Sequence, residues 1–132
     1  MILNKGRVLL VDDEPLVLEM FESILTQDGY DVFVAPTSRE ALVHLEKVFF
    51  DVLVCDVMLE DLDGFDVLTI ARRRQPDLAV VLITGAPSEV DAERAARENV
   101  AYLSKPIGFD LLLRTVRASL EGVQAPTKTA LA

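Results

Sequence analysis

The chain has 132 residues, of which 51% are hydrophobic and 27% charged, and its formal net charge is −9. This length suits one globular domain with a sizeable core and excludes two ordinary domains. The acidic balance and the lack of a basic stripe argue against direct nucleic-acid binding, and they favour solubility and a basic partner. No window approaches the roughly 18 apolar residues of a membrane span, and residues 1–6 lack the apolar length of a signal peptide. We therefore expect a cytoplasmic protein with no membrane contact.

The first element that the sequence predicts is a buried strand over residues 7–11, which leads directly into Asp12 and Asp13. A helix follows, because Pro15 suits the first helical turn and apolar residues then recur at helical spacing. Gly29 is expected to end this helix.

A second strand over residues 32–35 is followed by a second helix. Thr37 and Glu40 have the spacing of a capping box at the start of that helix. His44, the only histidine, lies within it and is interpreted as a surface residue without a catalytic role.

The central strand is predicted over residues 51–56, where a near-continuous apolar run ends in Asp56. Such runs are typical of parallel sheets that helices cover on both faces. Asp56 then lies at the carboxyl end of the strand, where open α/β sheets bind ligands. Cys55, the only cysteine, is interpreted as a buried thiol in a reducing compartment.

After Asp56 comes an acidic loop, and Gly64 is expected to permit a tight turn into the third helix. That helix ends in three arginines at residues 72–74, which we interpret as a solvated helix terminus. The fourth strand, residues 79–83, releases Thr84 at its carboxyl end. Ser88 then opens a helix whose thin apolar face predicts the least firmly packed element.

The fifth strand is predicted over residues 100–104, before Lys105 and Pro106, and a last helix follows over residues 109–121. We expect a domain over residues 1–122. The tail, residues 123–132, has no apolar period and is expected to be a linker or disordered.

Five strands that alternate with five helices through short connections predict an α/β fold, a doubly wound five-stranded parallel sheet with right-handed crossovers. Its carboxyl edge gathers Asp12, Asp13, Asp56, Thr84 and Lys105. Three neighbouring carboxylates require a cation, and oxygen ligands with open positions favour Mg²⁺. With a lysine and a hydroxyl beside them, these acids point to phosphoryl transfer with Asp56 as the nucleophile.

Each of these residues also has an ordinary structural interpretation. Asp12 and Asp13 could serve only as helix caps, and Thr84 as a strand-end hydroxyl bonded to the backbone. Lys105 alone would be a surface charge and Tyr102 a half-buried strand aromatic. Their convergence on one edge favours the functional interpretation.

Five short motifs, in this order, resemble the signature set of bacterial response-regulator receiver domains, the CheY-like family. They are residues 11–15 (VDDEP), 55–59 (CDVML), 63–65 (DGF), 82–85 (LITG) and 103–106 (LSKP). The resemblance covers roughly residues 5–122 and implies the flavodoxin-like strand order 2-1-3-4-5. The family pattern usually has a proline where this chain has Glu60.

The resemblance implies that Asp56 accepts a phosphoryl group from the histidine of a sensor kinase. Asp12 and Asp13 would hold Mg²⁺ together with Asp56 and the backbone carbonyl of Met58.

Other positions match the family's switch. Thr84 would move onto the phosphoryl group, Lys105 would pair with it, and Tyr102 would turn inward as the threonine moves. The family also has a cis bond between Lys105 and Pro106. The surface of helix 88–98, strand 100–104 and helix 109–121 would then signal to a downstream protein, an effector domain or a second copy of the chain.

Two alternatives to this non-enzymatic switch remain open. An aspartate-nucleophile phosphatase of the haloacid dehalogenase type would also use Mg²⁺ and an aspartyl phosphate, but it would have an aspartate where Met58 stands. A degenerate receiver would act as a constitutive interaction module.

Overall fold

The computed structural model describes residues 4–122, and the expectations for the tail, residues 123–132, lie outside that range. Five strands alternate with five helices, as expected. The elements are β1 (Arg7–Val11), α1 (Pro15–Gln27), β2 (Asp31–Ala35), α2 (Ser38–Lys47), β3 (Val52–Asp56), α3 (Gly64–Arg74), β4 (Ala79–Thr84), α4 (Glu89–Arg97), β5 (Ala101–Ser104) and α5 (Phe109–Leu120).

The strands form one sheet in the order β2-β1-β3-β4-β5. Every neighbouring pair is parallel, so all five strands end at the same edge. The chain runs outward from β1 to β2 and then crosses to β3, which reverses the direction of winding at the β1–β3 boundary. The doubly wound α/β sheet predicted from the sequence is confirmed, including its strand order.

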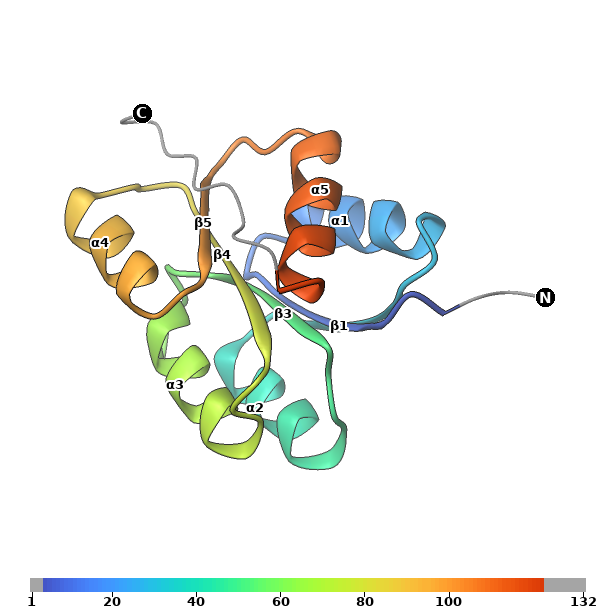
Figure 1. Ribbon diagram of the computed structural model, residues 1–132, viewed down its shortest axis with the longest axis horizontal. Coiled ribbons are helices and arrows are strands. Elements are labelled where there is room, and N and C mark those ends of the chain that lie inside the picture. The colour runs from blue at the N-terminus through green and yellow to red at the C-terminus, as the bar shows by residue number, and fades with distance from the viewer. Residues whose placement is uncertain (1–3, 123–132) are drawn as a thin grey trace.

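Helices cover both faces of the sheet (Figure 1). α1 and α5 pack on one face, where Phe21, Leu25, Leu112 and Val116 join the inner side chains of the strands. α2 and α3 pack on the other face, and α4 lies at the end of the sheet beside β5. Because strands covered on both sides bury every side chain, β3 is buried over its whole length.

Side-chain caps start three helices. Thr37 Oγ1 accepts a hydrogen bond from Glu40 N at α2, and Ser88 Oγ accepts one from Asp91 N at α4. At α3, Asp63 and Asp66 form a reciprocal capping box that was not predicted from the sequence. Each cap satisfies backbone N–H groups that the first helical turn leaves unpaired.

α4 has a single buried residue, Ala95, fewer than any other helix. The helix is held instead by polar and aromatic contacts at its middle and at its C-terminal end. The guanidinium of Arg94 lies 4.3 Å from the ring centre of Phe65, and Arg72 donates to the carbonyl of Glu98 at 2.6 Å. The prediction of a thinly packed helix is therefore confirmed.

Two surface interpretations are wrong. His44 is half-buried, because its Nε2 lies 3.1 Å from the carbonyl oxygen of Val34 and its ring packs edge-on against Phe33. Arg72 is also half-buried, since its long side chain reaches the carbonyl oxygens of Leu78 and Glu98. Arg73 and Arg74 are exposed, as the sequence predicts for a solvated helix terminus.

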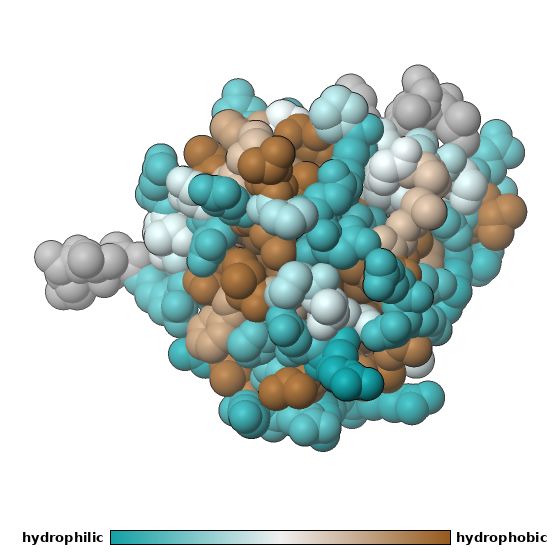
Figure 2. Space-filling model, turned by 180° about the vertical axis from the view of Figure 1, so that it is seen from behind, coloured by the Kyte–Doolittle hydropathy of each residue, from teal (hydrophilic) through white to brown (hydrophobic). Residues whose placement is uncertain are grey.

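Hydrophilic residues interrupt the apolar patches on the face shown in Figure 2. Within residues 4–122, no helix combines the length and the hydropathy that a membrane crossing needs.

Cys55 is fully buried, as expected, and burial raises the pKa of its thiol well above the ordinary value. A thiol held in its protonated form is a poor nucleophile.

Candidate functional site

The site is built where four neighbouring strands end. Asp12 directly follows β1, Asp56 is the last residue of β3, Thr84 the last of β4, and Lys105 directly follows β5. The backbone continues the pairing here, since Val57 N donates to the Ile83 carbonyl and Lys105 N to the Thr84 carbonyl. The sheet therefore brings together residues that lie up to 93 positions apart in the sequence, from Asp12 to Lys105.

Lys105 lies among three carboxylates. Its Nζ is 2.9 Å from Asp56 Oδ2, 2.8 Å from Asp12 Oδ2 and 2.7 Å from Glu14 Oε1. Burial disfavours the charged amine, but the contacts with Asp12, Asp56 and Glu14 outweigh it and raise the pKa of Lys105 above its usual range. Lys105 is thus a fixed positive charge within the acid cluster.

Asp12 is fully buried and is held from two sides. Its Oδ1 accepts a hydrogen bond from Glu14 N at 2.8 Å. Its Oδ2 accepts no hydrogen bond from any residue in the range 4–122, although Lys105 Nζ lies in ion-pair contact. The pKa of Asp12 is raised above its ordinary value, mainly because the carboxylate is buried.

Asp56 has a partner on each carboxylate oxygen. Met58 N donates to Oδ1 at 2.9 Å, and Lys105 Nζ donates to Oδ2 at 2.9 Å. The side chain is nearly fully buried, with 4% of its surface exposed. Its orientation is therefore fixed from both sides before any ligand binds.

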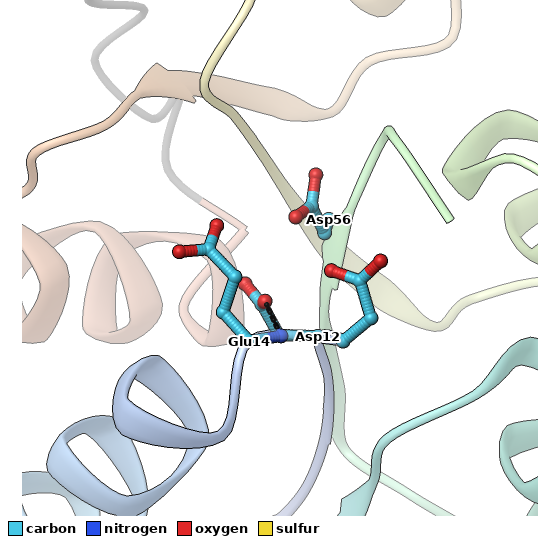
Figure 3. Close-up of side chains that lie close together, drawn as sticks. Asp12, Glu14 and Asp56 are labelled. Atoms are coloured by element: carbon cyan, nitrogen blue, oxygen red, sulfur yellow. Dashed lines mark hydrogen bonds between the residues drawn. The ribbon is translucent and has the colours of Figure 1, made fainter. Parts of the chain in front are cut away.

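The acid cluster fits a divalent cation. Asp12, Asp13, Glu14 and Asp56 each offer a carboxylate oxygen, and these atoms all lie within 4.8 Å of one another. Figure 3 shows the labelled acids gathered where β1 and β3 end, with the Glu14–Asp12 hydrogen bond dashed. A buried carboxylate oxygen without a hydrogen bond, at Asp12, matches the hard oxygen ligands that Mg²⁺ prefers.

Glu14 is a member of this cluster that was not predicted from the sequence. Its position in the acidic triplet of residues 12–14 was the available signal. That triplet alone does not show that the side chain turns back towards a lysine 91 residues away.

Gly64 approaches the backbone that follows Asp56. A Cβ at this position would lie 2.6 Å from the Asp56 carbonyl oxygen and 2.9 Å from Val57 Cα. The φ angle of Gly64 is not positive. The chain turns tightly into α3 here, as expected, since Gly64 N donates to the Val57 carbonyl. The glycine is required because two backbone segments nearly touch, and not because the turn needs a left-handed conformation.

Thr84 ends β4, the strand beside Asp56, whereas Tyr102 lies within β5, and both are fully buried. Thr84 Oγ1 accepts a hydrogen bond from Ala86 N at 3.0 Å, and the Tyr102 hydroxyl accepts one from Ser88 N at 3.1 Å. Burial raises the pKa of Tyr102, so that the phenol stays neutral. The Tyr102 ring already lies inside the protein, where it links β5 to the start of α4.

Two further details bear on the family resemblance. The bond between Lys105 and Pro106 is cis, as the resemblance implies. Glu60, in the place where the family usually has proline, is exposed.

Comparison with known proteins gives a consistent result. TrcR, a transcriptional regulatory protein of Mycobacterium tuberculosis, is 35% identical over 115 residues, which are 86% of this chain and 45% of TrcR. A CheY-like receiver domain protein from Methanospirillum hungatei is 30% identical with a TM-score of 0.83, and the match covers 88% of this chain and 94% of that one. The beryllofluoride-activated NtrC4 receiver domain dimer is 34% identical with a TM-score of 0.83, covering 88% and 97%.

The chain spans less than half the length of the curated relatives that it matches, between about 26% and 45%. Its similarity to them is therefore a similarity to one domain of longer transcriptional regulators. The model of the response regulator receiver domain matches residues 8–117, most of the chain. The protein therefore belongs to the response regulator receiver domain family.

Proposed function

We propose that this protein is a phosphorylation-dependent switch in which Asp56 accepts a phosphoryl group from the histidine of a sensor kinase. The observation that carries the proposal is the buried Asp56 carboxylate, which Met58 N and Lys105 Nζ orient at the edge where α/β sheets bind ligands. Family membership and the acid cluster support it further.

The chemistry is a transfer between two nucleophiles. A carboxylate oxygen of Asp56 forms a bond to phosphorus as the phosphorus–nitrogen bond of the donor breaks. Mg²⁺, held by Asp12, Asp13, Asp56 and the Met58 carbonyl, supplies neutralising charge when bound. Lys105, already 2.9 Å from Asp56 Oδ2, contributes a positive charge beside the transferred oxygens.

The signal then leaves through the hydroxyl of Thr84. This side chain binds Ala86 N in the structure, and the new acceptor oxygens on Asp56 draw it away from that partner. Tyr102 is tied to the start of α4, because its hydroxyl accepts a hydrogen bond from Ser88 N. The surface formed by α4, β5 and α5 therefore changes with phosphorylation.

A downstream protein, an effector domain or a second copy of the chain would bind this surface. The dimer described for the activated NtrC4 receiver supports the last possibility. The proposed role involves protein partners in the cytoplasm, without direct contact with nucleic acid or membrane, and without turnover of a metabolite.

Incubation with Mg²⁺ and acetyl phosphate, followed by intact mass spectrometry, tests the proposal. We expect a gain of one phosphoryl group in the wild type and none in Asp56→Asn. Continuous release of phosphate over many turnovers would instead indicate a phosphatase. A wild-type mass that stays unchanged would indicate a degenerate receiver and would refute the proposed function.

A further inference from the structure

Glu14 is placed to act on the site through Lys105. It is the N-terminal capping residue of α1, and its backbone N–H fixes Asp12 Oδ1. Its side chain accepts a hydrogen bond from Lys105 Nζ at 2.7 Å. One residue thus holds both an acid of the metal cluster and the cation of the site.

The three partners of Lys105 differ sharply in exposure. The side chains of Asp12 and Asp56 are 0% and 4% exposed, whereas that of Glu14 is 59% exposed. Ion pairs that reach solvent contribute little and are readily broken, while buried pairs are costly to separate. Of the three contacts, the one with Glu14 is the easiest to release.

Lys105 Nζ already donates hydrogen bonds to Asp56 and to Glu14, and it lies in ion-pair contact with Asp12. An ammonium group has three donor hydrogens, and three carboxylates surround Nζ at 2.7–2.9 Å. The carboxylate of Glu14 therefore competes with any oxygens of a phosphoryl group on Asp56 for the donor hydrogens of Lys105.

We infer that Glu14 is a positioning residue that competes with the phosphoryl group for Lys105 and so sets how readily the modified state forms. The inference rests on the proposed function. It assigns to Glu14 a restraining role in the unmodified state, where its carboxylate accepts a hydrogen bond from Lys105 that the phosphoryl oxygens would otherwise accept.

Titration of the Mg²⁺-loaded protein with beryllium fluoride, a phosphoryl mimic, followed by ¹⁹F NMR, tests this role. Glu14→Gln keeps the size of the side chain and removes its charge. We expect it to bind the mimic more tightly by up to about fivefold, the range of a partly exposed ion pair. Glu60→Gln is the matched control, because Glu60 is exposed and forms no ion pair within residues 4–122; it should bind like the wild type.

A double-mutant cycle separates action through Lys105 from direct charge repulsion. In a Lys105→Met background the effect of Glu14→Gln should vanish. An equal gain in that background would overturn the inference in favour of simple repulsion. A wild type that binds the mimic while Glu14→Gln changes nothing would overturn the inference alone, whereas a wild type that binds none would overturn the proposed function too.

A second measurement does not depend on Lys105→Met being well folded. In ¹⁵N-lysine NMR of the metal-free protein, Glu14→Gln should speed exchange of the Lys105 Nζ protons with water, and Glu60→Gln should not. Unchanged exchange in Glu14→Gln would contradict the restraint.

Discussion

Gly64 lies so close to Asp56 that a Cβ on the glycine would be 2.6 Å from the Asp56 carbonyl oxygen. Because that neighbour is backbone, Gly64→Ala forces the two segments apart. We expect the variant to lose about 1 to 3 kcal/mol of unfolding free energy, the usual cost of overpacking, and to bind Mg²⁺ more weakly. Urea denaturation and isothermal titration with Mg²⁺ measure the two effects.

Gly85→Ala is the control, because a Cβ there meets nothing within 4 Å. It should leave the unfolding free energy nearly unchanged. Equal stability of both variants would show that the approach of Gly64 to Asp56 is not close in solution.

Replacing Lys105 should lower the free energy of unfolding, because two buried acids lose their cation. In Lys105→Met, Asp12 and Asp56 lose the cation that lies 2.8 and 2.9 Å away, and breaking such a buried pair costs about 3 kcal/mol. Because the pKa of Lys105 is raised in the folded state, its contribution is fully present at neutral pH and is lost only in strong alkali. Chemical denaturation in EDTA at pH 7 should show the loss, and added Mg²⁺ should recover part of it.

The contribution of Asp12 to the stability of the fold should change with pH in the opposite direction to that of a surface acid in an ion pair. Its folded pKa is raised above 3.8, so the folded protein binds the proton more tightly than the unfolded chain does. Ionisation therefore lowers stability as the pH rises from about 3.8 through the raised pKa, and this loss is recovered on acidification. In EDTA, the stability of the wild type relative to Asp12→Asn should fall as the pH rises over that interval and level off above it.

If the stability of the wild type relative to Asp12→Asn rises with pH instead, the result would contradict the burial of Asp12.

Mg²⁺ should stabilise the wild type, because a bound cation relieves repulsion among Asp12, Asp13 and Asp56. Ligand at 100 times its dissociation constant contributes about 2.7 kcal/mol by linkage. Thermal denaturation with and without Mg²⁺ measures the shift. A melting curve that millimolar Mg²⁺ leaves unmoved would show that these acids do not form a metal site.

The sequence predicts the sheet well because each of β1, β3, β4 and β5 is an apolar run that ends in a polar residue or leads into one. This pattern alone places Asp12, Asp56, Thr84 and Lys105 at one edge of the sheet. Parallel pairing brings the carboxyl ends of the strands together whatever the details of packing.

What the sequence does not predict depends on side-chain reach and on distances between backbones. Arg72 looks like one of three solvated arginines, but it bends towards the carbonyl of Glu98. Glu14 looks like a first-turn acid, but it turns towards Lys105. Gly64 looks like a turn residue, and only the packed structure shows that a neighbouring backbone excludes a side chain there.

The most direct measurement of the switch is hydrogen exchange of the Mg²⁺-loaded protein with and without beryllium fluoride. The Tyr102 hydroxyl holds Ser88 N, and Thr84 Oγ1 holds Ala86 N, so a ligand on Asp56 that draws Thr84 away should alter protection at the start of α4. We expect the largest changes in α4, β5 and α5, with a coupling of about 1 to 3 kcal/mol, and none in Asp56→Asn. Changes confined to α1 and α2, with α4 and β5 silent, would contradict a signal that leaves through this surface.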